Sequence, residues 1–237
     1  MPPMEINVSG DCELNHAAER AFLSVCVSAE STVQEEAAQN ATGAVNTLHA
    51  LFRELSPKAL TGEATTDAPV TVFDIGSITT SSKIPINRDE QPSGPRQYSA
   101  FARLSAVFRD FSRLGQIVPQ LFTMPFVEVR SIDWRLTDAT TAELTKEARK
   151  KALLDAIEKA TIYSEVVGRD VFVVKIDDQG GCSSMSRTKQ TARGWKREEL
   201  EHPDTTSLDL EPQEIAVSAS ISAKFATAEW KNPLVRY

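Results

Sequence analysis

The chain has 237 residues, of which 41% are apolar and 25% are charged, and its formal net charge at pH 7 is −7. This composition is ordinary for a soluble globular protein with a sizeable core. The negative charge argues against sequence-independent binding to nucleic acid, which depends on a surplus of lysine and arginine. No stretch approaches the roughly 20 apolar residues that cross a bilayer. We therefore expect neither a nucleic-acid partner nor a membrane.

The cysteines and the amino terminus bear on the cellular compartment. Cys12, Cys26 and Cys182 are odd in number and lack C-x-x-C spacing, so they predict neither a disulfide framework nor a zinc site. Residues 1–5 lack the basic start and apolar run of a secretory signal. We therefore expect an intracellular protein, cytoplasmic, with the nucleus as the alternative compartment.

Periodic patterns of apolar residues divide the chain before residue 140 into strands and helices. The expected elements are, in chain order, strands at 5–14 and 21–29, a helix from Ser31 or Thr32 to about Leu55, strands at about 70–80 and 98–108, a helix at 111–121 and a strand at 127–136. Asn15 and His16 are expected to join the first two strands. The polar stretches 58–69 and 81–96 are expected to be surface loops.

The stretch from Thr140 to Asp177 predicts a capped helix followed by a strand. Thr140 and Glu143 fit a capping box, in which their side chains satisfy exposed amides at a helix start. Small side chains then form a stripe along one side, which lets the helix lie close on a sheet. The stripe consists of Ala148, Ala152, Ala156 and Ala160. Gly168 is expected to end the helix, and 171–176, apolar on both faces, to follow as a buried strand.

The last predicted element is a strand at 215–230, in which apolar residues alternate with serines. Its length offers an edge for pairing with another subunit. The order of elements predicts an α+β fold, in which two long helices and one shorter helix pack on a mainly antiparallel sheet. We expect a single domain over 1–237, with a flexible polar insertion at about 178–213.

Three stretches of the sequence resemble the SIMPL domain family, which is named for a signalling molecule that associates with a pelle-like kinase. These stretches are Ile6–Gly10 at the start of the domain, Tyr98–Phe101 at the start of a middle strand, and Glu147–Gly168 across the alanine-rich helix. The resemblance spans nearly the whole chain apart from insertions. It implies a SIMPL-like fold of the class expected above.

The family resemblance also implies a type of function. The family has no established catalytic residues, so the resemblance assigns none here. Bacterial relatives are largely exported and associated with envelope or oxidative-stress phenotypes, and some look like ring or channel-like oligomers. Vertebrate relatives look like kinase-binding signalling adaptors. This chain departs from the bacterial pattern because it lacks an export signal and carries the long insertion, which argues against an envelope role.

A second motif lies in the insertion. The run Arg187, Thr188, Lys189, Gln190, Thr191, Ala192, Arg193 is identical to a stretch near the amino terminus of histone H3. One interpretation is a histone-tail mimic that readers or modifiers bind as an extended peptide, with methylated Lys189 held in an aromatic cage. The alternative is a solvated basic loop whose identity to the tail is accidental. An internal segment also lacks the free amino terminus that many readers bind.

The signatures of common enzymes are absent from the sequence. No H-E-x-x-H, P-loop, G-x-S-x-G or G-x-G-x-x-G motif occurs, and His16, His49 and His202 have no carboxylate spaced to complete a metal site. No catalytic residue, metal ligand or cofactor is therefore predicted. Cys182 is the thiol expected to be accessible, which makes it a candidate redox site; the alternative is an unreactive surface thiol. Cys26 is expected to pack on a strand face.

The sequence as a whole favours a non-enzymatic protein-binding or adaptor protein. Its partners would be signalling or chromatin-associated proteins, and its recognition segment would be the polar insertion. The alternative is a structural homo-oligomer or stress-related assembly built through sheet edges. An enzyme with an unrecognised site is a third class.

Overall fold

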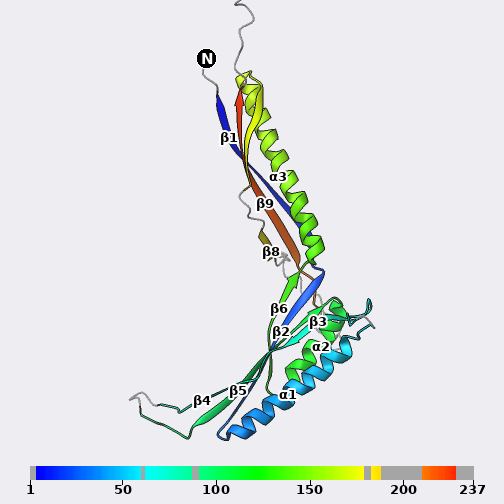
Figure 1. The fold of residues 1–237 in the computed structure, drawn as a ribbon, viewed down its shortest axis with the longest axis vertical. Coiled ribbons are helices and arrows are strands. Elements are labelled where there is room, and N and C mark those ends of the chain that lie inside the picture. The colour runs from blue at the N-terminus through cyan, green and yellow to red at the C-terminus, as the bar shows by residue number, and fades with distance from the viewer. Residues whose placement is uncertain (1–3, 60–61, 87–90, 179–182, 188–209, 228–237) are drawn as a thin grey trace, which may run out of the picture. The chain divides into compact units, whose positions relative to one another are not determined.

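The structure is a computed structural model that describes residues 4–59, 62–86, 91–178, 183–187 and 210–227 (Figure 1). Its elements in chain order are β1 (Glu5–Ala17), β2 (Arg20–Ser31), α1 (Gln34–Leu55), β3 (Val70–Ile75), β4 (Thr79–Lys83), β5 (Gln97–Phe108), α2 (Phe111–Thr123), β6 (Val127–Arg135), α3 (Asp138–Val167), β7 (Val171–Asp178), β8 (Ser183–Arg187) and β9 (Glu214–Thr227). All of these strands pair antiparallel, which confirms the predicted α+β fold.

The contacts within the chain divide it into two compact units. The first unit consists of residues 1–17, 136–189 and 213–237, and the second of residues 18–135 and 190–212. That the chain is a single domain over 1–237 stays a prediction. Each unit has its own sheet. Among the described helices, α3 belongs to the first unit and α1 and α2 belong to the second.

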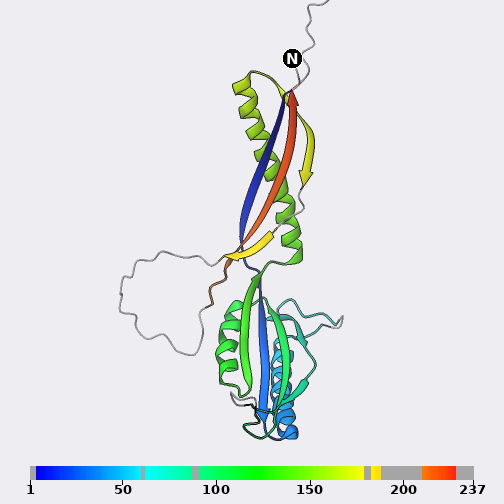
Figure 2. The same cartoon turned by 90° about the vertical axis from the view of Figure 1, so that its left-hand side faces the viewer.

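The first unit is a four-stranded sheet with α3 running along one face (Figures 1 and 2). β9 lies in its centre, paired with β1 on one side and with both β7 and β8 on the other. The free edge predicted for the last strand is therefore wrong, because neighbouring strands occupy both sides of β9. The edges of the sheet are β1 on one side and β7 and β8 on the other.

The helix α3 lies close on this sheet because its inner side carries small residues. The buried residues of α3 are the four alanines of the predicted stripe, which confirms that prediction. They pack against Val8, Ala219, Ile221, Ala223 and Phe225. A Cβ added to Gly10 would lie 2.0 Å from the carbonyl oxygen of Ala152 and 2.5 Å from the amide nitrogen of Ala156. Helix and strand therefore meet backbone to backbone at Gly10, where no side chain fits.

The ends of α3 agree with the sequence at the carboxyl end and differ at the amino end. Thr137, not Thr140, is the N-cap, and its hydroxyl accepts the Thr140 N–H at 3.3 Å. Gly168 ends the helix as predicted, with φ of 69° and an N–H that donates to the carbonyl of Ser164 at 2.9 Å. The left-handed conformation at Gly168 is one that glycine adopts without steric cost.

The strand β7 is not the buried strand that its sequence predicted. Val171 is half-buried, and every following residue up to Asp178 is exposed. The reason is its position, because β7 lies at the edge of the sheet while α3 packs mainly on β1 and β9. An apolar run at a sheet edge therefore remains open to solvent.

The second unit is a five-stranded sheet in the order β3-β5-β2-β6, with β4 also paired to β5. α1 packs on β2 and β5, and α2 packs on β6, from the same face of the sheet (Figure 1). Alternate residues of β2 and β5 point toward these helices. The largest fully buried side chains of this core include Phe52, Phe108, Leu23, Leu48 and Leu104.

Three boundaries in the first half of the chain differ from the prediction. α1 begins at Gln34 after an N-cap at Val33, not at Ser31 or Thr32. Asn15 and His16 do not join the first two strands, because β1 stays paired with β9 as far as Ala17. The single strand expected at about 70–80 is divided into β3 and β4, which pair with different parts of β5. The end of α1 at Leu55 agrees with the prediction.

The polar insertion contains a strand that the sequence did not predict. β8 pairs with β9, and its last residue, Arg187, lies opposite Glu214. The expectation of a flexible segment is therefore wrong for Ser183–Arg187. Residues 188–209 lie outside the described residues.

Candidate protein-binding surface

Past Ala160 the inner side of α3 changes from small to large residues. Tyr163 and Val167 continue the alanine stripe at spacings of three and four residues, so they lie on the same side of the helix. Both are about half exposed, and Val166 beside them is 83% exposed. The buried stripe thus ends at Ala160, and the last two turns of α3 present bulky apolar side chains to solvent.

The strand β7 adds further exposed apolar side chains directly after the Gly168 turn. Its large apolar residues from Phe172 to Ile176 are between 39% and 55% exposed. We call the two groups together the apolar surface. It consists of Ile162, Tyr163, Val166 and Val167 on α3 and Phe172, Val173, Val174 and Ile176 on β7. Single exposed apolar residues are common on soluble proteins, whereas such a concentration makes this segment a candidate interaction site.

The face of this sheet that α3 does not cover is polar along β9, although the register places Phe172 of β7 on it, opposite Ala226, and leaves Val173 and Ile176 on the α3 side. The β9 residues between its buried positions include Ser220, Ser222 and Lys224, and Lys224 forms an ion pair of 2.7 Å with Glu5 on β1. A polar open face is what an antiparallel sheet with one solvated side requires. The apolar surface is therefore a local feature, not a property of the whole unit.

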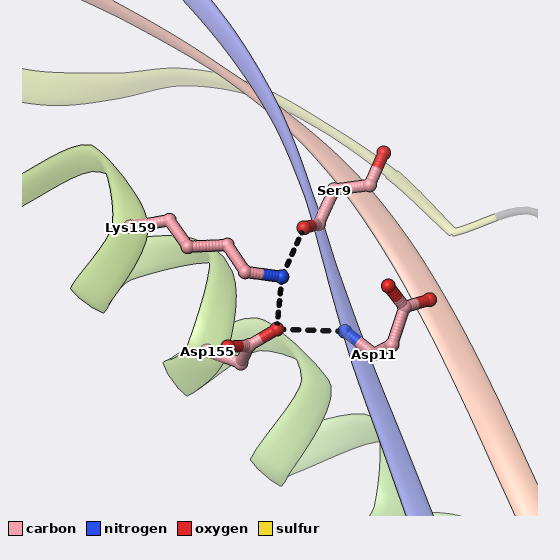
Figure 3. Close-up of polar contacts among 4 residues, drawn as sticks. All are labelled: Ser9, Asp11, Asp155 and Lys159. Carbon is pink, nitrogen blue, oxygen red and sulfur yellow. Dashed lines mark hydrogen bonds and ion pairs between the residues drawn. The ribbon is translucent and has the colours of Figure 1, made fainter. Parts of the chain in front are cut away.

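The opposite edge of the sheet is β1. Beside Gly10, side chains from α3 bind the backbone groups of this edge and close it to another strand (Figure 3). Lys159 Nζ donates to the carbonyl oxygen of Ser9 at 2.9 Å and to Asp155 Oδ2 at 2.7 Å. The same carboxylate oxygen accepts the Asp11 N–H at 2.9 Å. Unpaired backbone groups of this kind are what an edge strand offers to a foreign strand. Because α3 occupies them on both sides of Gly10, β7 is the edge with the better access.

The two charged side chains that close this edge, Asp155 and Lys159, each stabilise the charged form of the other. The hydrogen bond from Lys159, together with the one from the Asp11 N–H, holds the pKa of Asp155 below its ordinary value. The Asp155 carboxylate in turn raises the pKa of Lys159. Both groups therefore stay charged across the neutral range, and the closure of β1 persists there.

The cysteines and histidines of the described residues form no second candidate site. Cys26 is buried on β2, as predicted, and His49 on α1 packs its ring 5.8 Å from that of Phe73. Burial raises the pKa of the Cys12 thiol, with a smaller opposing effect from Lys151, so this thiol stays protonated at neutral pH. In the described part of the chain no group of three or more His, Cys, Asp or Glu could hold a metal ion. Within the same residues, no helix has the length and apolar character to cross a membrane.

The candidate residues of the polar insertion are only partly placed. Arg187 ends β8, while Thr188, Lys189, Gln190, Thr191, Ala192 and Arg193 lie outside the described residues. Cys182 lies outside them as well. The histone-like segment and the redox site therefore stay predictions.

The family of the chain follows from a comparison over nearly its whole length. The sequence matches the profile of SIMPL, described as a protein of unknown function (DUF541), over residues 6–225. This chain belongs to the SIMPL family. No match to a curated protein was found. The resemblance stated from three short stretches is confirmed, and the SIMPL match reaches from β1 to β9.

The three stretches that carry the SIMPL resemblance have clear places in the fold. Ile6–Gly10 lies in β1 and supplies the glycine that α3 touches. Tyr98–Phe101 lies in β5, which pairs with β2, β3 and β4. Glu147–Gly168 forms most of α3 and its terminus. The apolar surface lies at the end of this last stretch and in the strand that follows it.

The sequence contains a signal for part of the apolar surface, although this signal predicts burial. Val171–Ile176 is apolar on both faces, a pattern that favours a strand buried on both sides. The same pattern fits an edge strand that a partner covers. Only the pairing of β9 with β1, β7 and β8 distinguishes the two, and a pattern within one segment does not contain that information.

Proposed function

We propose that this SIMPL protein binds a protein partner, without catalysing a reaction, and that the partner docks on the apolar surface. The observation that carries the proposal is the exposure of eight large apolar side chains within residues 162–176. Exposed apolar groups gathered in this way are costly in a protein that stays alone in water. The partners we expect are signalling or chromatin-associated proteins of the cytoplasm or nucleus.

Burial of this surface supplies part of the free energy that a specific complex needs. Complete burial of one large apolar side chain contributes about 1.5–3 kcal/mol. Since these side chains are already about half buried, covering all eight contributes on the order of 6–12 kcal/mol. Association itself costs about 4–15 kcal/mol, so apolar burial alone gives a weak complex. A stable complex needs a second contribution.

The edge of β7 supplies that second contribution. In the described sheet β7 pairs with β9 on one side and with no strand on the other. An extended segment of a partner can add a strand at such an edge, because main-chain hydrogen bonds give affinity and side-chain pockets give specificity. We propose this mode of docking, with the end of α3 covering the apolar residues of the added strand.

A pair of matched valine substitutions tests the proposal. Val174 and Val72 are exposed valines on β7 and β3, with exposed fractions of 55% and 62%. In affinity capture from cell extract, the unaltered chain and Val72→Lys are both expected to retain specific partners, whereas Val174→Lys is expected to lose them. The recovered partner is then tested for binding as a purified protein. Equal capture by all three chains would overturn the proposal.

A second candidate function is a homo-oligomer formed through the same edge. The specific observation is that β7 is self-complementary, since an antiparallel pair of β7 strands centred on Ile176 sets Lys175 of each copy opposite Asp177 of the other. In the single chain these two side chains pair with each other at 2.7 Å. Pairing of two copies through β7 would extend the sheet across the contact.

A charge exchange tests the homo-oligomer. Light scattering coupled to size-exclusion chromatography is expected to give a mass above that of one chain, 26.0 kDa. Lys175→Asp sets like charges opposite each other and should lower the mass, whereas the double variant Lys175→Asp/Asp177→Lys restores the complementarity and the mass. A single-chain mass for the unaltered protein at all concentrations would exclude this candidate.

The histone-like run is a separate recognition element that we propose to test at the peptide level. It starts at Arg187, the last residue of β8, and Lys189 is the residue whose modification it implies. A peptide covering 184–195 is expected to accept methyl groups from a histone lysine methyltransferase or to bind a reader domain. The same peptide with Lys189→Ala is the control. Absence of both activities would leave the identity accidental.

A further inference from the structure

The second unit contains two adjoining hollows that the proposed function does not use. Their volumes are about 560 Å³ and about 480 Å³. Ser56, Lys58 and Phe73 line both of them, so the two form one concave region between the end of α1, β3 and the loop that follows α1. We call this region the basic hollow.

Basic side chains outnumber acidic ones in the basic hollow. Arg53, Lys58 and Arg109 line it, and Glu63 is the carboxylate among its described lining residues. Arg53 and Lys58 make no ion pair and no side-chain hydrogen bond with the described part of the chain. The end of α1 adds about half a negative charge, which leaves a clear positive balance in a protein whose net charge is −7.

The guanidinium of Arg109 is held in place but only partly satisfied. The Arg109 backbone N–H donates to the carbonyl of Pro69 at 2.9 Å, and Nη1 donates to the carbonyl of Thr66. Nε is buried and has no hydrogen-bond partner within the described residues. A buried N–H without a partner costs on the order of 1–3 kcal/mol, so such a group calls for an acceptor that the described residues do not provide. The edge formed by Nε and Nη2 is the one that binds an oxyanion through two parallel hydrogen bonds.

Ser56 adds a second polar side chain to the lining of the hollow. This residue is 4% exposed and lines both hollows. Its backbone N–H donates to the carbonyl of Arg53, whereas its hydroxyl makes no hydrogen bond within the described residues. A hydroxyl among the residues that line a basic cavity is a donor for an anion that enters it.

We propose that the basic hollow binds the phosphate group of a small molecule. Arg109 is the main ligand through its guanidinium, Ser56 donates a hydrogen bond, and Arg53 and Lys58 supply the charge that balances a dianion. A carboxylate carries one charge and would need Arg109 alone, so the two further cations favour phosphate. The ring of Phe73, packed against His49 and Phe52 with centroids 5.8 Å and 6.2 Å apart, forms an apolar wall for the rest of the molecule.

The proposal is tested with the full chain and three probes at constant ionic strength. Inorganic phosphate, glycerol 3-phosphate and acetate are titrated while amide resonances are followed by NMR. Both phosphates are expected to bind saturably, to shift the amides of Ser56 and Arg109, and to bind more tightly than acetate by about tenfold. Glycerol 3-phosphate is expected to bind more tightly than inorganic phosphate because of the Phe73 wall.

Charge-matched variants distinguish phosphate binding at the basic hollow from unspecific electrostatic attraction of phosphate to the protein. Arg53 and Lys58 are exposed, so Arg53→Ala/Lys58→Ala should fold normally and weaken phosphate binding by about tenfold. The control Lys83→Ala/Arg113→Ala removes the same charge from exposed positions of the same unit and should bind as the unaltered chain does. Arg109→Lys keeps the charge but removes the two-pronged edge, and should lose the binding.

Each other result overturns part or all of the proposal. Equal weakening in the control would mean unspecific attraction, and equal binding of acetate would remove the preference for phosphate. Equal binding of the two phosphates would make inorganic phosphate the ligand and not a small molecule. Val174→Lys on β7 should leave phosphate binding unchanged, so the failure of the partner-binding proposal and the failure of this one are distinguishable.

Discussion

Gly10 is the residue on which the closeness of α3 and β1 depends. We expect Gly10→Ala to lower the free energy of unfolding by about 3 kcal/mol or more, because its Cβ would enter the backbone of α3 at Ala152 and Ala156. Chemical denaturation followed by circular dichroism measures the change. The helix must move or the sheet must bend, since rigid backbone atoms cannot rotate away.

Gly43 provides the matched control for this substitution. It lies inside α1, and a Cβ there meets nothing within 4 Å. Gly43→Ala is expected to raise stability by about 0.5–1 kcal/mol, because alanine has the higher helix propensity. A similar loss of stability at both glycines would contradict the close approach at Gly10.

The contribution of Asp155 to the stability of the protein is expected to depend on pH. Its pKa is lowered below the ordinary value of 3.8, chiefly by the hydrogen bond from Lys159. A carboxyl with a lowered folded pKa contributes stability that is fully present above its unfolded pKa and is lost as pH falls through the folded value. The difference in urea midpoint between the unaltered chain and Asp155→Asn is therefore expected to be largest at neutral pH and to shrink below 3.8.

The Lys159→Met background is the control for Asp155. Without the ammonium the carboxylate loses its main partner, so Asp155→Asn should then change the midpoint much less at neutral pH. A difference that stays constant from about pH 7 to about pH 2.5 would show that the charge of Asp155 does not contribute.

At the scale of elements, β7 is an exposed edge strand whose side chains are expected to contribute little to the stability of the fold. We expect Val174→Thr to change the free energy of unfolding by less than about 0.5 kcal/mol, because an exposed side chain gives up little apolar contact. The same change at Val8, which is buried in the core between β1 and α3, should cost about 1–3 kcal/mol, because it buries a hydroxyl. Equal costs at the two valines, measured by urea denaturation, would mean that β7 belongs to the core.

The contrast between β7 and α3 marks how far the sequence predicts this structure. The four buried alanines, the Gly168 terminus and the alternation in β9 are local patterns, and the structure agrees with each of them. The burial of β7, the occupied sides of β9 and the existence of β8 depend on which distant segments pair, and no local pattern encodes that. Thr137 replaced Thr140 as N-cap because both threonines suit the position and the choice is set by where β6 ends.

The candidate sites follow the same division. The apolar character of Val171–Ile176 is plain in the sequence, whereas its exposure is a result of strand order. The basic hollow combines Arg53 and Lys58 near the end of α1 with Arg109 after β5, residues that are more than fifty positions apart in the chain. Spacing rules of the kind that identify enzyme motifs do not apply to a site assembled in this way.

At the scale of the whole molecule, the two units differ in how the chain builds them. Apart from residues 210–212, the described residues of the second unit all fall within one segment of the chain, 18–135, whereas the first unit joins segments from both ends of the chain and its middle. The second unit has its own core around Phe52, Phe108 and Leu104. Pairing β1 with β9 instead requires closure of a loop of about two hundred residues, which is entropically costly and slow.

The continuous stretch is therefore expected to fold alone. A fragment covering 18–135 should give dispersed amide resonances, a cooperative thermal transition and the phosphate response of the full chain, because the described sheet, both of its helices and the basic hollow lie within it. The first unit depends on segments that this fragment lacks. The fragment should therefore not form the homo-oligomer, and it should not capture the partners that Val174→Lys loses. A fragment that stays unfolded at low temperature would mean that the second unit needs the first, and would support the single domain expected from the sequence.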